Sequence, residues 1–463
     1  MNTDRRQGQL PLGRKITYGL PAFALAMVGI PVYVHIPKFY TDVIGVNIAW
    51  VGAILMGVRV FDAFSDPLMG ALSDRTQTRM GRRRPYMLWG SIGLAASTFL
   101  LFVPPQVDGF TATAWFATTI VALFAFWTVV TVPYEALGPA LTRDYTERTS
   151  LFALRDGLLI AGTLLAAASP VLIEGLQENA ATAVAQRQKF LWIALLYAPL
   201  LIGTCLWCVL RIRENEDGQE SLATLTIGNL RSVRRNRPFW ILLTAYMIGA
   251  LGSNLPATLI LYYVQYVLES NRADLFLLLY FASGILLLPV WIQVSQRIGK
   301  KNAWLASMAI NTCAFSGVYF LGAGDEWGYA ILVVISGMGF GATLALPSAI
   351  QADVIDYDEL LTGRRQEGWY IGIWSVVKKL AAAIGVGAGL TLLGMAGYEP
   401  GKTQPPEVVQ TLKVLYALVP SVCNAVAFTI ALAFPISQTV HQQILESIAM
   451  IKQGREAVDP LKP

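Results

Sequence analysis

The sequence has few charged residues. Only 14% of its 463 residues are Asp, Glu, Lys or Arg, whereas soluble globular domains carry roughly 25%. The two histidines, His35 and His441, are too few for a metal centre built from imidazoles. All four cysteines lie in apolar runs, which favours small buried side chains over a disulfide framework; they are Cys205, Cys208, Cys313 and Cys423. This composition excludes a soluble enzyme.

Long apolar runs fill most of the chain. Hydrophobic residues make up 55% of the sequence, and the mean hydropathy is +0.51. One membrane-spanning helix needs ~20 mainly apolar residues, so a chain of this length can supply about a dozen. Apolar segments begin near residues 17, 48, 86, 112, 150, 189, 238, 273, 303, 328, 366 and 408. The sequence therefore predicts an all-α integral membrane protein with twelve transmembrane helices.

Positive charge is concentrated in alternate loops. The net charge is +5, and because the Lys and Arg residues lie between apolar runs we expect no nucleic-acid partner. The basic loop positions are Arg5, Arg6, Arg14, Lys15, Arg75, Arg79, Arg82, Arg83, Arg84, Arg211, Arg213, Arg231, Arg234, Arg235, Arg237, Arg297, Lys300 and Lys301. The intervening loops carry few basic residues. Positively charged loops stay cytoplasmic, so both termini are predicted to be cytoplasmic.

A polar stretch divides the chain into two groups of six helices. We predict an N-terminal bundle with a cation site over 1–210, a cytoplasmic linker over 211–237, a C-terminal bundle over 238–437 and a cytoplasmic tail over 438–463. A short internal repeat favours this division, because SDRTQTRMGRRRPY after the second helix is similar to SQRIGKKNAW after the eighth. Parallel repeats of this kind build many transporters around a midplane site.

The second predicted helix carries charges within an apolar run. Arg59, Asp62 and Asp66 are spaced i, i+3 and i+7 and share one face. Each charge near the bilayer centre costs ~3 kcal/mol on insertion scales, and two carboxylates at i, i+4 repel each other. Arg59 can neutralise one carboxylate, which leaves the other for a cation or a proton, and Ser65 adds an oxygen that suits a hard cation. The alternative is a structural ion pair in the bundle core.

Two other predicted helices carry polar candidates. In the fourth helix Thr128, Thr131 and Glu135 lie about one turn apart; Pro133 and Pro139 are expected to interrupt the helix and free carbonyls for a polar cavity. Arg155 is the expected partner of Glu135 or Asp156, or else belongs to a surface pair. In the eleventh helix Tyr370, Trp374 and Lys378 are spaced i, i+4 and i+8. Such a stripe serves packing or an interfacial belt more often than a substrate platform, and Lys378 either faces the second-helix acids or reaches the surface.

Three segments resemble one family of transporters. They are FDAFSDPLMGALSDRTQTRMGRRRPY, VPYEALGPALTRDYTERTSLFALRDG and VIDYDELLTGRRQEGWYIGIWSVVKKLAAAIG. They are similar to the glycoside-pentoside-hexuronide:cation symporters, the melibiose-permease-like branch of the major facilitator superfamily. The resemblance implies a twelve-helix major facilitator fold that couples a cation to uphill substrate movement by alternating access.

The resemblance also implies a cation site. Asp62 and Asp66 match the acidic pair, Ser65 takes the place of its neutral oxygen neighbour, Thr128 matches the fourth-helix hydroxyl, and Lys378 resembles the eleventh-helix lysine. A site as complete as this favours Na⁺ as the bound metal ion, with H⁺ or Li⁺ as alternatives. We expect no other cofactor and no catalytic residues.

The sugar site departs from the melibiose type. Ala26 and Thr131 stand where those members carry acids that hold sugar hydroxyls, which puts a galactoside in doubt. The substrate candidates are Tyr33, Trp127, Thr131, Glu135, Arg155, Trp374 and Lys378. The predicted substrate is a small sugar or glycoside. An amphipathic substrate such as a lysolipid is the alternative, because animal lysolipid symporters are similar in fold.

Charged residues in the cytoplasmic loops suggest gates. The sequence also lacks the features that an enzyme or a channel would need. Cytoplasmic latches that hold an outward-open state are expected at Asp74, Arg83, Arg84, Asp356 and Arg364. A membrane-embedded enzyme would need a nucleophile beside a base, and a channel would need a symmetric ring; a sensor with a transporter fold stays open. We expect a monomer of the bacterial inner membrane whose partners are a small-molecule substrate and the lipid bilayer.

Overall fold

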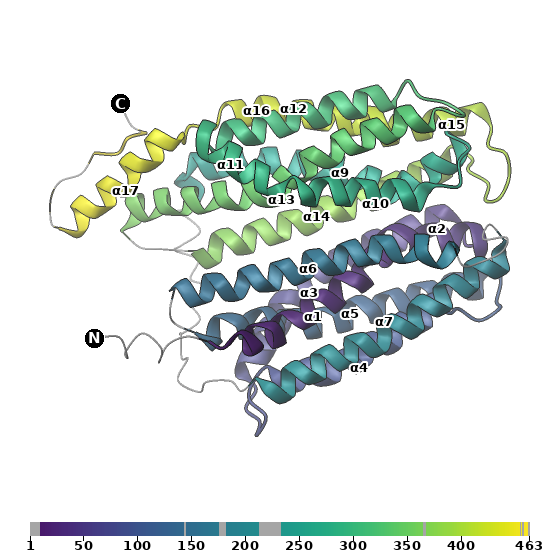
Figure 1. Ribbon diagram of the computed structural model, residues 1–463, viewed down its shortest axis with the longest axis horizontal. Helices are drawn as coiled ribbons and strands as arrows, with labels where there is room; N and C mark the ends of the chain where they lie inside the picture. Colours follow the sequence, from purple (N-terminus) through teal and green to yellow (C-terminus); the bar gives the residue numbers. More distant parts are fainter. Residues whose placement is uncertain are drawn as a thin grey trace. The chain divides into compact units, whose positions relative to one another are not determined.

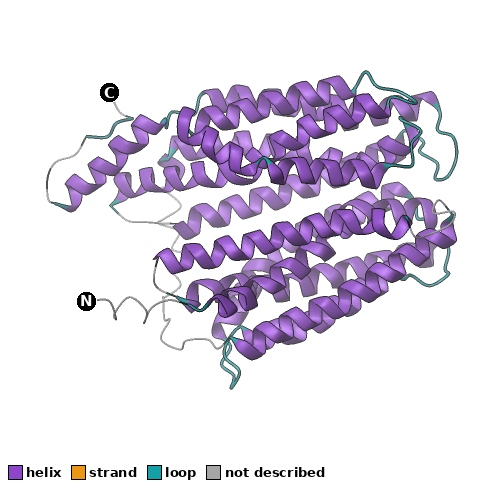
Figure 2. Ribbon diagram, in the orientation of Figure 1, coloured by secondary structure: helices purple, strands orange, loops and turns teal. Residues whose placement is uncertain are grey.

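A computed structural model describes residues 10–142, 145–175, 182–212, 233–363, 367–453, 455 and 458–461. Within these ranges the regular elements are helices (Figure 2). Ten helices are long and apolar enough to cross a membrane, and a bent helix pair raises this to 11. The chain is thus an all-helical membrane protein, as its composition predicted.

The chain divides into two units, and each is described by itself. Unit 1 comprises Met1–Glu220 and Val386–Gln404, and unit 2 comprises Ser221–Gly385 and Pro405–Pro463. The elements of unit 1 (purple to teal in Figure 1) are α1 Leu12–Ile30, η2 Pro31–His35, α2 Ile36–Lys38, η3 Phe39–Val43, α3 Ile48–Arg75, α4 Arg84–Phe102, α5 Gly109–Leu141, α6 Tyr145–Glu174 and α7 Ala183–Arg211.

Unit 2 holds most of the remaining helices. They are α9 Arg237–Tyr266, α10 Ala273–Leu286, α11 Leu288–Ile298, α12 Lys300–Val318, α13 Glu326–Thr362, α14 Glu367–Met395, α15 Pro406–Lys413, η4 Val414–Leu418, α16 Val419–Leu432 and α17 Gln438–Lys452. The last ten residues of α14 belong to unit 1. Each apolar segment predicted from the sequence begins within six residues of a helix start, because a long apolar run is a strong signal for a buried or spanning helix.

Polar side chains fix several helix starts. Asn47 accepts a hydrogen bond from the backbone N–H of Ala49 at the start of α3, and Thr182 accepts one from Ala185 at the start of α7. Ser437 does the same at the start of α17. Such caps satisfy backbone donors that have no partner inside the helix.

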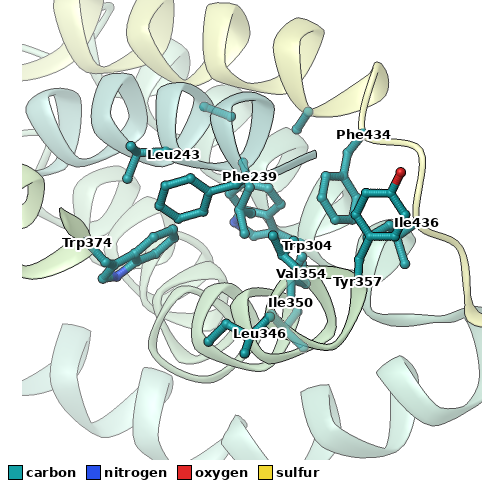
Figure 3. Packing of buried hydrophobic residues seen from close by; sticks show 14 of the residues in the cluster. Phe239, Leu243, Trp304, Leu346, Ile350, Val354, Tyr357, Trp374, Phe434 and Ile436 are labelled. Atoms are coloured by element: carbon teal, nitrogen blue, oxygen red, sulfur yellow. The ribbon is translucent and has the colours of Figure 1, made fainter. Parts of the chain in front are cut away.

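The same helix pairing recurs in the two units. In unit 1, α5 packs against α3 and α4, and α7 packs against α1 and α4; in unit 2, α13 packs against α10 and α12, and α16 packs against α9 and α12. The core of unit 2 is a cluster of apolar side chains from α9, α11, α12, α13, α14, α16 and α17 (Figure 3). Corresponding helices thus pair alike in the two units, in agreement with the short internal repeat of the sequence.

Two local predictions are wrong. Pro133 and Pro139 do not interrupt their helix, since α5 runs continuously from Gly109 to Leu141. Membrane-spanning helices tolerate such prolines because neighbouring groups satisfy the backbone carbonyls that a proline frees. Cys205 and Cys208 are buried as predicted, but Cys313 is exposed and Cys423 is half-buried. The apolar run around Cys313 predicts a helix but does not predict which of its sides faces the protein. An apolar side chain on a spanning helix can face lipid as readily as protein.

Candidate cation and substrate site

Four oxygen-bearing side chains from α3 and α5 meet inside unit 1. The Thr128 hydroxyl lies 3.0 Å from Oδ1 of Asp62 and 3.1 Å from Oδ1 of Asp66. Ser65 Oγ lies 3.3 Å from Thr128 Oγ1 and donates to the Asp62 carbonyl at 3.2 Å. Asp62 is 4% exposed and Thr128 is 2% exposed. Four of the predicted site residues therefore converge on one point, from two helices that pack along their length.

Carboxylate and hydroxyl oxygens make up this arrangement. Thr128 carries a single hydroxyl proton, so it can donate to only one of the two carboxylates at a time. Two carboxylates one helical turn apart repel each other, and burial strengthens that repulsion because the local dielectric is low. Carboxylate and hydroxyl oxygens are the ligands that hard cations prefer. The cluster therefore has the chemistry to bind a metal ion such as Na⁺, or to share a proton.

Arg59 lies elsewhere than the sequence suggested. Its guanidinium carbon is 4.0 Å from the centroid of the Tyr33 ring and 4.8 Å from that of Phe124. It forms no ion pair with any residue in the described part of the chain. Such ring contacts contribute ~0.5–2 kcal/mol each, whereas an arginine at the centre of a membrane helix costs ~2.5–3.5 kcal/mol. The two ring contacts together are therefore of the same order as the cost of this charge.

The α5 substrate candidates continue from the acid cluster along one helix. Trp127 is half-buried, and its ring lies 3.5 Å from the position that a Cβ would take at Gly29 in α1. Thr131 donates to the Trp127 carbonyl at 2.9 Å. Glu135 is exposed, one turn further along. The structure thus brings Trp127 close to α1 but uses the Thr131 hydroxyl within α5 itself.

Arg155 of α6 pairs with its sequence neighbour. Its guanidinium lies 2.7 Å from Oδ1 of Asp156 and 4.7 Å from the Phe152 ring. Of the two acids considered from the sequence, Asp156 is therefore the one that Arg155 contacts in this arrangement.

The α14 candidates belong to unit 2. Trp374 is 8% exposed and lies against Tyr246 with ring centroids 4.2 Å apart. It is part of the apolar core of that unit, together with Phe239 and Leu243 (Figure 3). Lys378 is exposed and has no hydrogen bond or ion pair with other described residues. Trp374 therefore packs as a core residue here.

The gating candidates form local contacts within each unit. Asp74 lies 3.6 Å from Arg83, whose guanidinium also donates to the Ala136 carbonyl at 2.5 Å. Arg84 donates through Nε to the Val209 carbonyl at 2.8 Å, near the last turn of α7. Cationic side chains at a helix C-terminus satisfy its free carbonyls. Arg364 lies outside the described residues.

In unit 2 the corresponding lysines make equivalent contacts. Lys300 donates to the Ala349 carbonyl of α13 at 3.3 Å and to Asp353 at 2.5 Å. Lys301 donates to the carbonyls of Leu432, at the end of α16, and of Phe434, at 2.8 and 2.6 Å. These two segments, residues 81–84 and 299–301, are called the basic turns. Each begins with a glycine at positive φ, Gly81 at 100° and Gly299 at 84°, where a side chain would be strained.

Sequence reasoning missed the partner of Asp356. His441 of α17 lies 3.1 Å from Asp356 and 3.5 Å from Asp353. The residues are 85 positions apart in sequence, and no periodicity links the tail helix to α13. Phe124, beneath Arg59, was missed for a similar reason, because one phenylalanine in an apolar run carries no signal of its own.

The family model of MFS/sugar transport proteins matches residues 17–438. The chain therefore belongs to this family, and within it to the glycoside-pentoside-hexuronide:cation symporters of the major facilitator superfamily. It is a multi-pass membrane transporter and not an enzyme, and it has bacterial relatives in the inner membrane.

Individual relatives cover nearly the whole chain. The glucuronide carrier protein homolog of Escherichia coli K12 is 30% identical over 421 residues, which is 89% of this chain and 90% of that protein. The isoprimeverose transporter of Lactiplantibacillus pentosus is 25% identical, over 90% of this chain and 87% of that protein. A mutant of the nucleoside transporter NupG aligns with a TM-score of 0.64 at 13% identity, over 91% of this chain and 99% of that one. The structural likeness shows the fold.

Proposed function

We propose that this chain is a secondary symporter that couples the entry of a cation, with Na⁺ favoured over H⁺, to the uptake of a small sugar or glycoside by alternating access. The observation that supports it most is the convergence of Asp62, Asp66, Ser65 and Thr128 in the interior of unit 1. The glucuronide and isoprimeverose carriers among the relatives support a sugar-type substrate.

Coupling follows from charge repulsion in this proposal. A cation that binds between Asp62 and Asp66 relieves their repulsion, draws α3 and α5 together and completes the adjacent substrate site. A membrane potential of 100 mV moves one charge with ~2.3 kcal/mol, enough for about a fiftyfold gradient. Cation binding would thereby be linked to substrate binding, because each favours the same arrangement of the two helices.

The proposal includes twelve spans, two six-helix bundles and cytoplasmic termini. The first span would run through α1 to η3, and α10 with α11 would form one span bent by 42°. The 19-residue α12, less apolar than the others, would supply the twelfth. The bundles would cover 1–210 and 238–437, joined by the 211–237 linker, with 438–463 as the tail, in a monomer.

The remaining candidates complete the proposal. Substrate would contact Tyr33, Trp127, Thr131, Glu135, Arg155, Trp374 and Lys378. The basic turns, with Asp74, Arg83, Arg84, Asp356 and Arg364, would act as cytoplasmic gates whose contacts change during transport. The Asp74–Arg83 distance of 3.6 Å and the Asp356–His441 pair support roles as exchangeable contacts.

The cation assignment is tested by Na⁺ binding to purified protein. We expect Asp66→Asn to raise at least tenfold the Na⁺ concentration that gives half of the maximal rise in melting temperature. In this titration Na⁺ replaces choline at constant ionic strength. Asp108→Asn, in an exposed loop, is the matched control. Unchanged Na⁺ dependence in Asp66→Asn would contradict the site. The same titration at several pH values separates Na⁺ from H⁺ as the coupling ion.

A further inference from the structure

Two acids of α13 and the histidine of the tail helix α17 meet in unit 2. Nε2 of His441 lies 3.1 Å from Oδ2 of Asp356 and 3.5 Å from Oδ1 of Asp353. One ligand atom from each of the three residues lies within 4.8 Å of the other two. Within the described ranges this is the one group of three His, Cys, Asp or Glu side chains that converge so closely.

The spacing of these atoms matches that of ligands around a small metal ion. Ligands about 2.1 Å from a tetrahedral ion lie about 3.4 Å from one another, and the two distances from His441 fall on either side of this value. One imidazole nitrogen and two carboxylate oxygens suit Zn²⁺ and similar transition-metal ions. Mg²⁺ and Ca²⁺ instead prefer six or more oxygen ligands. The donor set therefore favours a transition metal.

Contacts on both sides of His441 hold α17 against unit 2. Ile444 and Ile448 of α17 are buried in the apolar core of that unit. Further along the helix, Lys452 lies 2.8 Å from Glu359 of α13. The histidine and the two acids are therefore held by packed helices, which lowers the entropy that an ion must remove to bind them.

A cavity of about 310 Å³ adjoins the cluster, and Asp353, His441 and Lys300 are among the residues that line it. Zinc sites with three protein ligands keep a fourth position for a water molecule, and the cavity has room for one. Nζ of Lys300 lies 2.5 Å from Oδ1 of Asp353. Lys300 is therefore the cation that an incoming metal ion has to displace from this carboxylate.

We propose that Asp353, Asp356 and His441 form a binding site for a divalent transition-metal ion such as Zn²⁺. The ion is bound by Nε2 of the histidine and by one oxygen of each acid, and it fixes α17 to α13. This site belongs to unit 2, whereas the acid cluster of Asp62 and Asp66 belongs to unit 1. The proposal goes beyond the symport function and does not depend on it.

The test is calorimetric titration of Zn²⁺ into the purified full chain, without a polyhistidine tag and at about pH 7.5, because ligation needs a neutral imidazole. We expect one Zn²⁺ per chain, and an affinity at least tenfold lower in His441→Ala and in Asp356→Asn. Lys300→Met should raise the affinity, because it removes the competing cation. Glu446→Gln, an exposed acid on α17, is the matched control and should bind as wild type does.

Selectivity and the identity of the ligands give two further readouts. Mg²⁺ at about a hundredfold excess should leave Zn²⁺ bound, because this site offers too few oxygens for Mg²⁺. X-ray absorption of the Zn²⁺ complex should show nitrogen and oxygen neighbours at about 2.0–2.2 Å and no sulfur. A sulfur neighbour would assign the ion to a cysteine, of which Cys313 is exposed, and Cys313→Ser should leave binding unchanged.

Four results overturn the proposal. They are no Zn²⁺ binding up to about 1 mM, an affinity in His441→Ala within twofold of wild type, displacement of Zn²⁺ by Mg²⁺, and a sulfur neighbour in the absorption spectrum. The melting temperature of each variant without metal, followed by tryptophan fluorescence, reports that it is folded. The absorption spectrum uses wild-type protein, so it decides the question even where a variant does not fold.

Discussion

Replacement of Thr128 by valine removes the one hydroxyl that lies between the two carboxylates. The side chain is 2% exposed, and valine has nearly the same shape, so the packing of α3 against α5 should be kept. What is lost is the oxygen 3.0 and 3.1 Å from the carboxylates of Asp62 and Asp66. Thr128→Val is therefore a test of the cluster that leaves both acids in place.

The size of the effect follows from the chemistry of that oxygen. A hydrogen bond to a charged group contributes about 1.5–3 kcal/mol, and each 1.4 kcal/mol is a factor of ten in affinity. We therefore expect Na⁺ affinity to fall by about 10- to 100-fold in Thr128→Val. The change lowers the affinity because the cation loses an oxygen ligand from its site.

The assay is half-saturation by Na⁺ in the melting-temperature titration, repeated with Thr128→Ser and Thr118→Val. Serine restores the hydroxyl and should recover most of the affinity. Thr118 is exposed on the same helix, and its hydroxyl bonds only to the Ala114 carbonyl at 2.8 Å. A Na⁺ affinity for Thr128→Val within twofold of wild type would refute the reasoning.

Two further predictions concern stability. Gly162→Ala should lower the melting temperature in detergent by several degrees, because its Cβ would lie 2.3 Å from the Phe23 carbonyl oxygen and overpacking costs about 1–3 kcal/mol; Gly157→Ala, with nothing within 4 Å, should not, and equal melting temperatures would contradict this. Lys189→Met should destabilise unit 1 by about 1–3 kcal/mol, because buried Lys189 pairs with Glu174 at 2.7 Å. The measure is thermal unfolding followed by tryptophan fluorescence, and recovery in Lys189→Arg is expected; unfolding of Lys189→Met at the wild-type temperature would oppose it.

The helices and the acid cluster could be predicted from sequence for physical reasons. Apolar runs of this length have few other stable conformations, because the bilayer core offers no hydrogen-bond partners and a helix satisfies its backbone groups internally. Asp62 and Asp66 are conspicuous because charge within such a run is costly. Thr128 is less conspicuous, since one threonine in an apolar helix is common; its spacing marks it as a polar candidate, and the family resemblance implies its role beside the acids.

Side-chain partners across helices could not be predicted in the same way. The spacing of Trp374 and Lys378 defines a stripe on α14, but periodicity does not say what covers it, and Trp374 packs against Tyr246 in the core. Arg59 was expected to neutralise an acid of its own helix, whereas it lies on rings from two other elements. Such choices depend on tertiary geometry.

The two basic turns close helix ends in the same way in the two units. Arg84 donates to a carbonyl near the end of α7, and Lys301 donates to a carbonyl at the end of α16. Each follows a glycine with a positive φ. Transplanting the second turn in place of the first should therefore yield a chain that still folds.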